Sequence, residues 1–229
     1  MKSVRRGLAI VGALVFGIVT QGYADPVTIE VSGTGIATTS CTDGAACDSN
    51  PLAGVVQFTA ANGALTVSAG GTASGAPQTT TNSLDLNYNI SASAGAPAGT
   101  YTIAVSQSGL SATNTTWNAT VGGAQNNNAT TAFAVFVDTN NALFVNSQGI
   151  CSAGPTSANP VGLTCSGGNF TDSQFSLTAL VTMTTQAGSS NVSGNVLLTA
   201  VPEPTSLLLF GSAVAGIGML RRRWGKVAA

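Results

Sequence analysis

The sequence predicts an all-β body, an antiparallel β-sandwich of about nine or ten short strands. Three observations support this prediction. Apolar and polar residues alternate with period two over several segments, clusters of turn-forming residues separate those segments, and no amphipathic helix of any length lies between residues 25 and 200. The alternation is clearest at residues 83–92, where Leu, Leu, Tyr and Ile share one face and Asp, Asn, Asn and Ser share the other.

The remaining strands follow along the chain. Alternation predicts strands at residues 100–107 and 174–187, and the segment 132–137, apolar on both faces, predicts a central strand. Turn chemistry at residues 138–141 favours a hairpin that returns through residues 142–145. Weaker strands are expected at residues 27–31, 55–60, 64–69, 117–121 and 192–200.

Two polar stretches rich in glycine or asparagine, residues 70–82 and 122–131, predict long surface loops. We find no internal repeat of fixed period, which disfavours a propeller or a solenoid. The body, residues 25–200, is therefore expected to be one domain with its own core.

Charge divides the chain into three parts. All seven Lys and Arg residues lie near the two ends, whereas residues 25–200 contain seven acidic residues and no basic one, a net charge of −7. A body without cations does not neutralise phosphates, so nucleic acid is excluded as a partner. The same charge excludes attachment of the body to an anionic membrane surface.

The N-terminus has the organisation of a secretory signal peptide. A short basic stretch at residues 1–6 precedes an apolar run at residues 7–19, and small residues follow it. The run is too short for a membrane span, which needs about 20 residues. We expect residues 1–24 to be removed by cleavage between Ala24 and Asp25.

The C-terminus, residues 201–226, has a second apolar run. Residues 205–220 are followed at once by a basic cluster, so we expect a transmembrane helix whose cationic end stays in the cytoplasm. A Pro-Glu-Pro triplet precedes the run. The triplet is Pro202, Glu203 and Pro204, and the cluster is Arg221, Arg222 and Arg223.

This order of triplet, glycine-containing apolar span and arginine cluster resembles the PEP-CTERM sorting domain. The resemblance implies a Gram-negative host with exopolysaccharide and biofilm habits, and a membrane-embedded exosortase that cuts near the triplet. It covers about 25 residues and implies nothing about residues of the body. The two prolines keep the triplet extended and end any helix, which would present its backbone to a protease.

Four cysteines form two local pairs in the sequence. An even count in an exported chain favours disulfides, and proximity favours the pairs 41–47 and 151–165 over the other two connectivities. Zinc is the rival interpretation, but the chain has no histidine and neither pair has the spacing of a zinc knuckle. The cysteines are Cys41, Cys47, Cys151 and Cys165.

Chemistry in the body is limited by the residues that it lacks. Without His, Lys or Arg it builds no Ser-His-Asp triad, Cys-His dyad, lysine Schiff base or arginine clamp. The remaining catalytic possibility is glycoside hydrolysis by a pair of the body's aspartates, although aspartates far more often form turns than act as catalysts. The candidates are Asp43, Asp48, Asp85, Asp138 and Asp172.

Two softer alternatives stay open. Calcium would find oxygen ligands at Asp43, Asp48 and Asn50, or at Asp138, Asn140 and Asn141, although neither group matches an EF-hand. Carbohydrate would stack on exposed aromatic rings, but the rings available read as inward-facing, which favours core packing. Those rings are Trp117, Tyr88 and Tyr101.

These observations predict an exported, exosortase-sorted structural protein of the cell surface or extracellular matrix, without catalytic activity, cofactor or metal. A carbohydrate-binding module of the exopolysaccharide is the alternative, and a carboxylate-dependent glycan hydrolase is a third. The expected partners are the secretion machinery, the exosortase, the membrane before processing, and exopolysaccharide.

Overall fold

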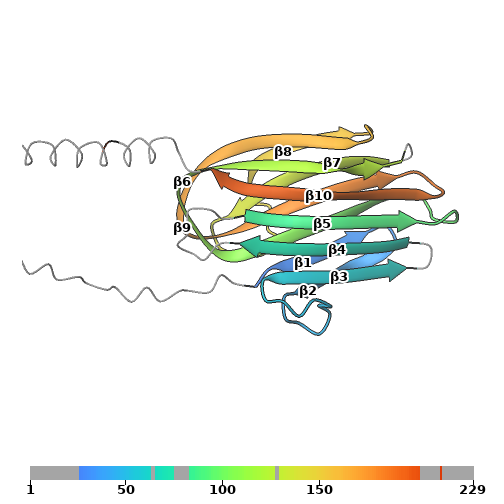
Figure 1. The fold of residues 1–229 in the computed structure, drawn as a ribbon, viewed down its shortest axis with the longest axis horizontal. Helices are drawn as coiled ribbons and strands as arrows, with labels where there is room; N and C mark the ends of the chain where they lie inside the picture. The colour runs from blue at the N-terminus through green and yellow to red at the C-terminus, as the bar shows by residue number, and fades with distance from the viewer. Residues whose placement is uncertain (1–25, 63–64, 75–82, 127–128, 202–211, 213–229) are drawn as a thin grey trace, which may run out of the picture.

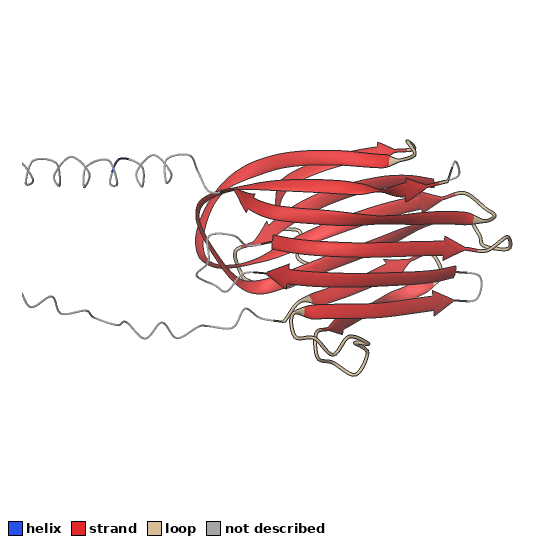
Figure 2. Cartoon of the chain, in the orientation of Figure 1, coloured by secondary structure: helices blue, strands red, loops and turns tan. Residues whose placement is uncertain are grey.

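A computed structural model describes residues 26–62, 65–74, 83–126, 129–201 and Ser212 (Figure 1). Within them the chain forms ten β-strands, all paired antiparallel (Figure 2). The strands are β1 (Thr28–Gly33), β2 (Ile36–Thr42), β3 (Val55–Asn62), β4 (Leu65–Ser74), β5 (Ser83–Ala92), β6 (Gly99–Gln125), β7 (Ala129–Asp138), β8 (Gln148–Thr156), β9 (Val161–Thr185) and β10 (Ser190–Val201).

Two long strands, β6 with 27 residues and β9 with 25, run through both layers of the molecule. Their pairing is irregular between Gln107 and Trp117, where the register shifts four times and both strands bend. Such irregularities let a strand turn the corner from one sheet into another. The bend therefore converts one continuous hydrogen-bonded sheet into a two-layered sandwich.

The layers can be defined from the pairing. The front sheet contains β3, β4, β5, β10, the second half of β6 (residues 116–125) and the first half of β9 (residues 161–167). The back sheet contains β2, β1, the first half of β6 (residues 99–107), the second half of β9 (residues 177–185), β7 and β8. Strands β3, β4, β5 and β10 lie side by side in Figure 1.

The core lies between these sheets because inward positions alternate with outward ones. On β5 the four predicted apolar residues are all buried, and the intervening polar residues are half-buried or exposed. On the back sheet Ile29, Ile103 and Val181 are fully buried. Each such side chain contributes about 1.5–3 kcal/mol on burial, so the sandwich holds together mainly through this one apolar layer.

An aromatic cluster fills the space at the bend of β6 and β9. The rings of Trp117 and Phe175 meet edge to face with centroids 6.3 Å apart, and Phe170 and Phe175 do so at 4.9 Å. Trp117 is fully buried. These edge-to-face contacts stabilise the corner in addition to the free energy gained by burying the apolar surface of the rings.

Both described ends of the body lie at the bend. Thr28, the first residue of β1, pairs with Ser106, and Val201, the last residue of β10, pairs with Thr116. Residues 106 and 116 flank the bend in β6. The segments that precede β1 and follow β10 are therefore joined to the same end of the sandwich.

The structure confirms the all-β sandwich and corrects several local predictions. The return of the β7 hairpin through residues 142–145 is wrong, because β8 pairs with β7 and residues 139–147 form a connecting loop. In this loop Asn141 and Phe144 have φ values of 61° and 59°, which a strand does not contain. Strand β2 was missed because only its first residue and Cys41 are buried, which gives it no alternation.

The two predicted long loops are also partly wrong. Residues 70–74 continue β4, and residues 122–125 continue β6 up to a short connection to β7 at residue 129. The described glycines of these two segments, Gly70, Gly71, Gly122 and Gly123, are strand residues on the front sheet. Within the described residues no helix is long and apolar enough to span a membrane, and the helix predicted at residues 205–220 lies outside those residues apart from Ser212.

Candidate functional site

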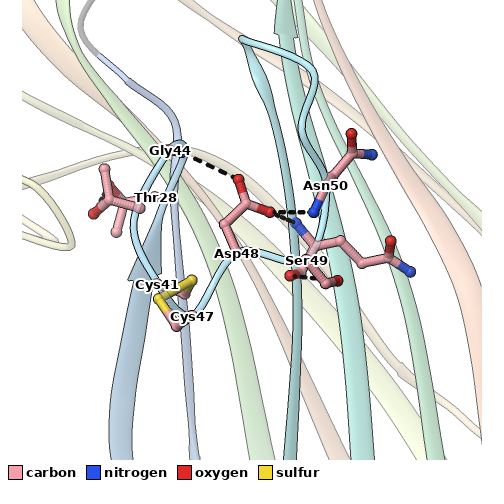
Figure 3. The surroundings of a disulfide bond; sticks show 9 residues. Thr28, Cys41, Gly44, Cys47, Asp48, Ser49 and Asn50 are labelled. Carbon is pink, nitrogen blue, oxygen red and sulfur yellow. Dashed lines mark hydrogen bonds between the residues drawn. A yellow bond between two sulfur atoms is a disulfide. The ribbon is translucent and has the colours of Figure 1, made fainter.

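Asp48 organises the loop that follows β2. Its carboxylate accepts backbone N–H bonds from Gly44 at 3.1 Å, Asn50 at 2.9 Å and Gln57 at 2.9 Å (Figure 3). Burial raises the pKa of Asp48, but the three N–H donors outweigh it and hold the pKa below its usual value. The carboxylate thus fixes the loop onto β3.

The loop also blocks the free edge of β3. The backbone N–H of Ser49 donates to the carbonyl of Gln57 at 3.0 Å, while the N–H of Gln57 donates to Asp48. An edge strand with open N–H and C=O groups would invite pairing with another chain. Asp48 and Ser49 occupy these groups at Gln57, the third residue of β3.

The calcium alternatives find their oxygens engaged elsewhere. Asp43 accepts the N–H of Gly54 at 2.6 Å, and Asn50 accepts the N–H of Leu52 at 3.0 Å. Asp138 accepts Ala142 N–H at 2.9 Å and the Ser147 hydroxyl at 2.8 Å, and the backbone bond from Ala142 is the main cause of its lowered pKa. Among the described residues no three His, Cys, Asp or Glu side chains form a metal-binding group.

The hydrolase alternative needs two carboxylates on one open surface. Asp85 lies on the outer side of β5, and its neighbours in register are Thr72 and Leu197. Burial raises the pKa of Asp85, opposed by a hydrogen bond from Asn195. Asp172 accepts the N–H of Gln174 at 3.1 Å in a local turn. No carboxylate therefore stands opposite Asp85 in the sheet.

The three aromatic residues considered for sugar stacking are core residues. Trp117 is 0% exposed, Tyr101 1% and Tyr88 4%, so none presents a ring to solvent. The large apolar side chains that are exposed among the described residues are aliphatic: Leu52, Val145 and Leu197. The structure thus assigns these rings to packing.

A groove on the outer face of the front sheet is the surface feature that sequence reasoning missed. Its volume is about 470 Å³, it crosses β3, β4, β5 and β10, and no acidic or basic residue lines it. Its polar lining is made of amides and hydroxyls: Asn50, Gln57, Ser68, Asn87, Asn89 and Ser193. The signal was present in the sequence, because the outward positions of the 83–92 strand carry asparagine.

The disulfide pairing is as predicted. Cys41 and Cys47 are bonded within the loop after β2, and Cys151 and Cys165 join β8 of the back sheet to β9 in the front sheet (Figure 3 shows the first pair). The described residues contain no free cysteine. The second disulfide closes the side of the sandwich opposite to the loop of Asp48.

Buried Gln125 stabilises the same closed side of the sandwich. It donates to the carbonyls of Thr156 and Ala158, both at 2.9 Å, and accepts the Thr131 hydroxyl at 2.7 Å. Two of these bonds reach β8 and the turn between β8 and β9, the strands that the second disulfide joins, and the third reaches β7, which pairs with both strands.

The sorting residues predicted at the two ends lie outside the described residues. They are Ala24, Asp25, Pro202, Glu203, Pro204, Arg221, Arg222 and Arg223. Their assignment rests on the sequence.

Comparison with known families supports the C-terminal assignment. Residues 200–223 match the family described as PEP-CTERM protein-sorting motif. No curated protein matches the chain.

Among solved structures, the chain is similar to TmCBM61 in complex with β-1,4-galactotriose, at 9% identity over 58% of this chain and 86% of that one, with a TM-score of 0.33. It is also similar to the CBM22-1 xylan-binding domain from Paenibacillus barcinonensis Xyn10C, at 16% identity over 66% and 87%, again with a TM-score of 0.33. Similarities this weak carry no argument about this chain, and the groove is therefore considered from its own residues.

Proposed function

We propose, from the PEP-CTERM sorting motif at residues 200–223, that the chain is an exosortase substrate whose body serves as a non-catalytic structural protein of the cell surface or extracellular matrix. The motif indicates an exported protein that is held in the membrane and then processed. This match is the observation that carries the proposal.

The body has properties expected of a domain that functions outside the cytoplasm. Two disulfides join cysteines 6 and 14 residues apart in sequence, and such bonds persist in oxidising compartments. The outer face of the front sheet is formed mainly by amides, hydroxyls and glycines, with Asp85 as its carboxylate in the described strands and Leu197 beside it as an exposed apolar side chain. A matrix module needs a stable scaffold with a soluble surface, and this sandwich supplies both.

The absence of catalysis is part of the proposal. The whole chain lacks histidine, and Lys and Arg are confined to the terminal segments. Each aspartate of the described body accepts a hydrogen bond from a backbone N–H, a hydroxyl or an amide, as in turns and ladders. General acid–base work by a carboxylate pair would need a partner beside Asp85, and its strand neighbours supply none.

Carbohydrate binding within the matrix is the second candidate. The groove favours it, because amides and hydroxyls are suited to hydroxyl-rich ligands. Stacking on aromatic rings does not support it, since Trp117, Tyr88 and Tyr101 are buried.

The sorting part of the proposal is tested by substituting the triplet in cells with and without the exosortase. Wild-type protein should leave the membrane fraction in cells that have the enzyme and stay in the membrane in cells that lack it. Glu203→Ala should stay in the membrane in both.

The chain offers a matched control, since its only other glutamate is Glu30 on β1. Glu30→Gln should be processed like the wild type. Processing of Glu203→Ala at the wild-type rate, or equal processing in cells without the exosortase, would overturn this part of the proposal.

A further inference from the structure

We infer that the groove on the front sheet, together with the outward residues next to it, binds a chain of neutral polysaccharide, with Asn87 and Asn89 of the groove as hydrogen-bond donors and Asn195, beside Asn87, as an acceptor. The inference rests on the proposed export of the body to a polysaccharide-bearing surface. It replaces the aromatic residues considered from sequence by a different set of side chains on a different face.

Asp85 determines how the central amides are oriented. A carboxylate only accepts hydrogen bonds, so the group of Asn195 that bonds to Asp85 is its NH2. The same NH2 donates to Asn87 Oδ1 at 3.1 Å. Both amides are thereby fixed: Asn195 offers its carbonyl oxygen to a ligand, and Asn87 offers its NH2.

Asn89 has the same polarity as Asn87. Its Oδ1 accepts the hydroxyl of Ser91 at 3.0 Å, which leaves its NH2 as the group for a ligand. Asn87 and Asn89 both point outward on β5 and are exposed. Two residues along a strand span roughly 6.6–6.8 Å, so the two donors are set apart along the groove. A hydroxyl both donates and accepts, and a donor beside an acceptor therefore suits the hydroxyls of a sugar.

A row of residues in register extends from the groove across the sheet. In register, Gly70 on β4 lies beside Asn87, and Gly122 on β6 lies beside Asn195, with Gly162 on β9 next to Gly122. With Gln57 on β3 this row crosses six strands. At about 4.8 Å between strands the row is roughly 24 Å long, enough for several sugar rings.

Packing does not require these glycines. A Cβ at Gly122 or Gly162 would meet nothing within 4 Å, and at Gly70 only the Val56 carbonyl at 3.7 Å, which is ordinary contact. None of the three has a positive φ. Glycine inside a strand is destabilising by about 0.5–1 kcal/mol relative to alanine, and it often marks the close approach of a ligand. Their role is best explained by the open surface that they leave.

Charge selects the class of polysaccharide. The lining has no acidic or basic residue, Asp85 adjoins it, and the body's charge is −7. A polyuronate would be repelled and would find no cation to pair with. A neutral glycan suffers no such repulsion.

The test measures binding of the processed protein, purified from the cell surface or medium, to immobilised dextran, xylan, β-1,4-galactan and the neutral exopolysaccharide of the producing cells. Alginate serves as the anionic comparison. We expect binding to at least one neutral polysaccharide and none to alginate. Asn87→Ala should weaken binding about 3- to 10-fold, as the loss of one hydrogen bond predicts.

Gly122→Thr provides the sharper test. It places a side chain on the open row beside the groove, at a position where a strand accepts threonine, so thermal stability should hold or rise while binding is lost. The matched control is Gly149→Thr on β8, an exposed strand glycine in the back sheet whose nearest Cβ contact is the Phe136 ring at 3.9 Å. This control should bind like the wild type.

Asp85→Ala should weaken binding as Asn87→Ala does, and Asp85→Asn, which keeps an acceptor for Asn195, should restore part of it. A folded, exported protein that binds no neutral polysaccharide in the panel would overturn the inference, as would Gly122→Thr binding at wild-type strength. Failure of the proposed function would be seen separately, as wild-type protein that is processed equally in cells without the exosortase, or as Glu203→Ala processed at the wild-type rate.

Discussion

The hydroxyl of Tyr88 gives the sharpest prediction about the fold. Tyr88 is 4% exposed, and its Oη lies in the core without a hydrogen-bond partner, against Gly194 of β10. A buried hydroxyl without a partner costs about 1–3 kcal/mol. Tyr88→Phe keeps the ring and removes this cost, but it also removes the van der Waals contacts of the oxygen. The variant should therefore be more stable than the wild type at pH 7 by about 1 kcal/mol, the lower end of that range.

The same site predicts a dependence on alkaline pH. Burial raises the pKa of Tyr88 from 10.0 to about 12. Because the pKa of this acid is raised on folding, the unfolded chain releases the Tyr88 proton at a lower pH than the folded protein does. The unfolding free energy of the wild type is therefore unaffected by this group below pH 10 and falls between pH 10 and 12. Two units correspond to about 2–3 kcal/mol. Tyr88→Phe lacks this loss.

Urea unfolding followed by tryptophan fluorescence at pH 7, 9, 10 and 11 would measure both effects. The difference in unfolding free energy between the variant and the wild type should start near 1 kcal/mol and widen above pH 10. A variant that is less stable by 1 kcal/mol or more at pH 7 would show that the hydroxyl has a partner. A constant difference from pH 9 to 11 would show that burial does not shift its ionisation.

Three further predictions concern other parts of the sandwich. Replacing Cys151 and Cys165 by serine should cost about 3 kcal/mol in urea unfolding, against about 2 kcal/mol for Cys41 and Cys47, because the first pair closes the longer loop; equal losses would contradict the loop argument. Hydrogen bonds lower the pKa of Asp138 in the folded protein, so the stability that they provide is present above the pKa of the unfolded chain and is lost as the pH falls through the pKa of the folded protein. Asp138→Asn should therefore make the unfolding free energy, measured by circular dichroism, depend less on pH on the acid side. An unchanged pH dependence would contradict this. Trp117→Ala should lower the unfolding free energy by about 3–5 kcal/mol, because a fully buried ring at the bend leaves a cavity, and a loss under 1 kcal/mol would show that the corner does not depend on it.

The fold class followed from the sequence because inward and outward residues alternate cleanly on strands such as β5. The long strands could not be predicted, because the bend in β6 lies among polar residues that read as the end of one strand and the start of another. Strand β2 lacked a signal, since Ala37 to Ser40 are exposed on both faces. Its place is set by pairing with β1, which is tertiary context.

The site was harder to predict than the fold. The alternation of apolar and polar residues correctly predicted that Tyr88 and Trp117 lie in the core, and their burial means that neither ring is available to stack on a sugar. The groove is formed by residues that lie opposite one another on four different strands. Asn87 and Asn195, for example, are 108 residues apart in the sequence, and nothing in the sequence predicts their contact. Glycines at Gly70 and Gly122 suggested loops, because composition alone does not distinguish a flexible connection from a strand surface kept open.

The central claim is that this chain is exported and trimmed at both ends around an oxidised β-sandwich. Intact-mass measurement of the protein recovered from cytosol, membrane, cell surface and medium tests it most directly. The account predicts a surface or medium species that begins at Asp25, ends near the Pro-Glu-Pro triplet and is 4 Da lighter than its reduced form, two for each disulfide. A soluble cytosolic species with all 229 residues and free thiols would contradict it.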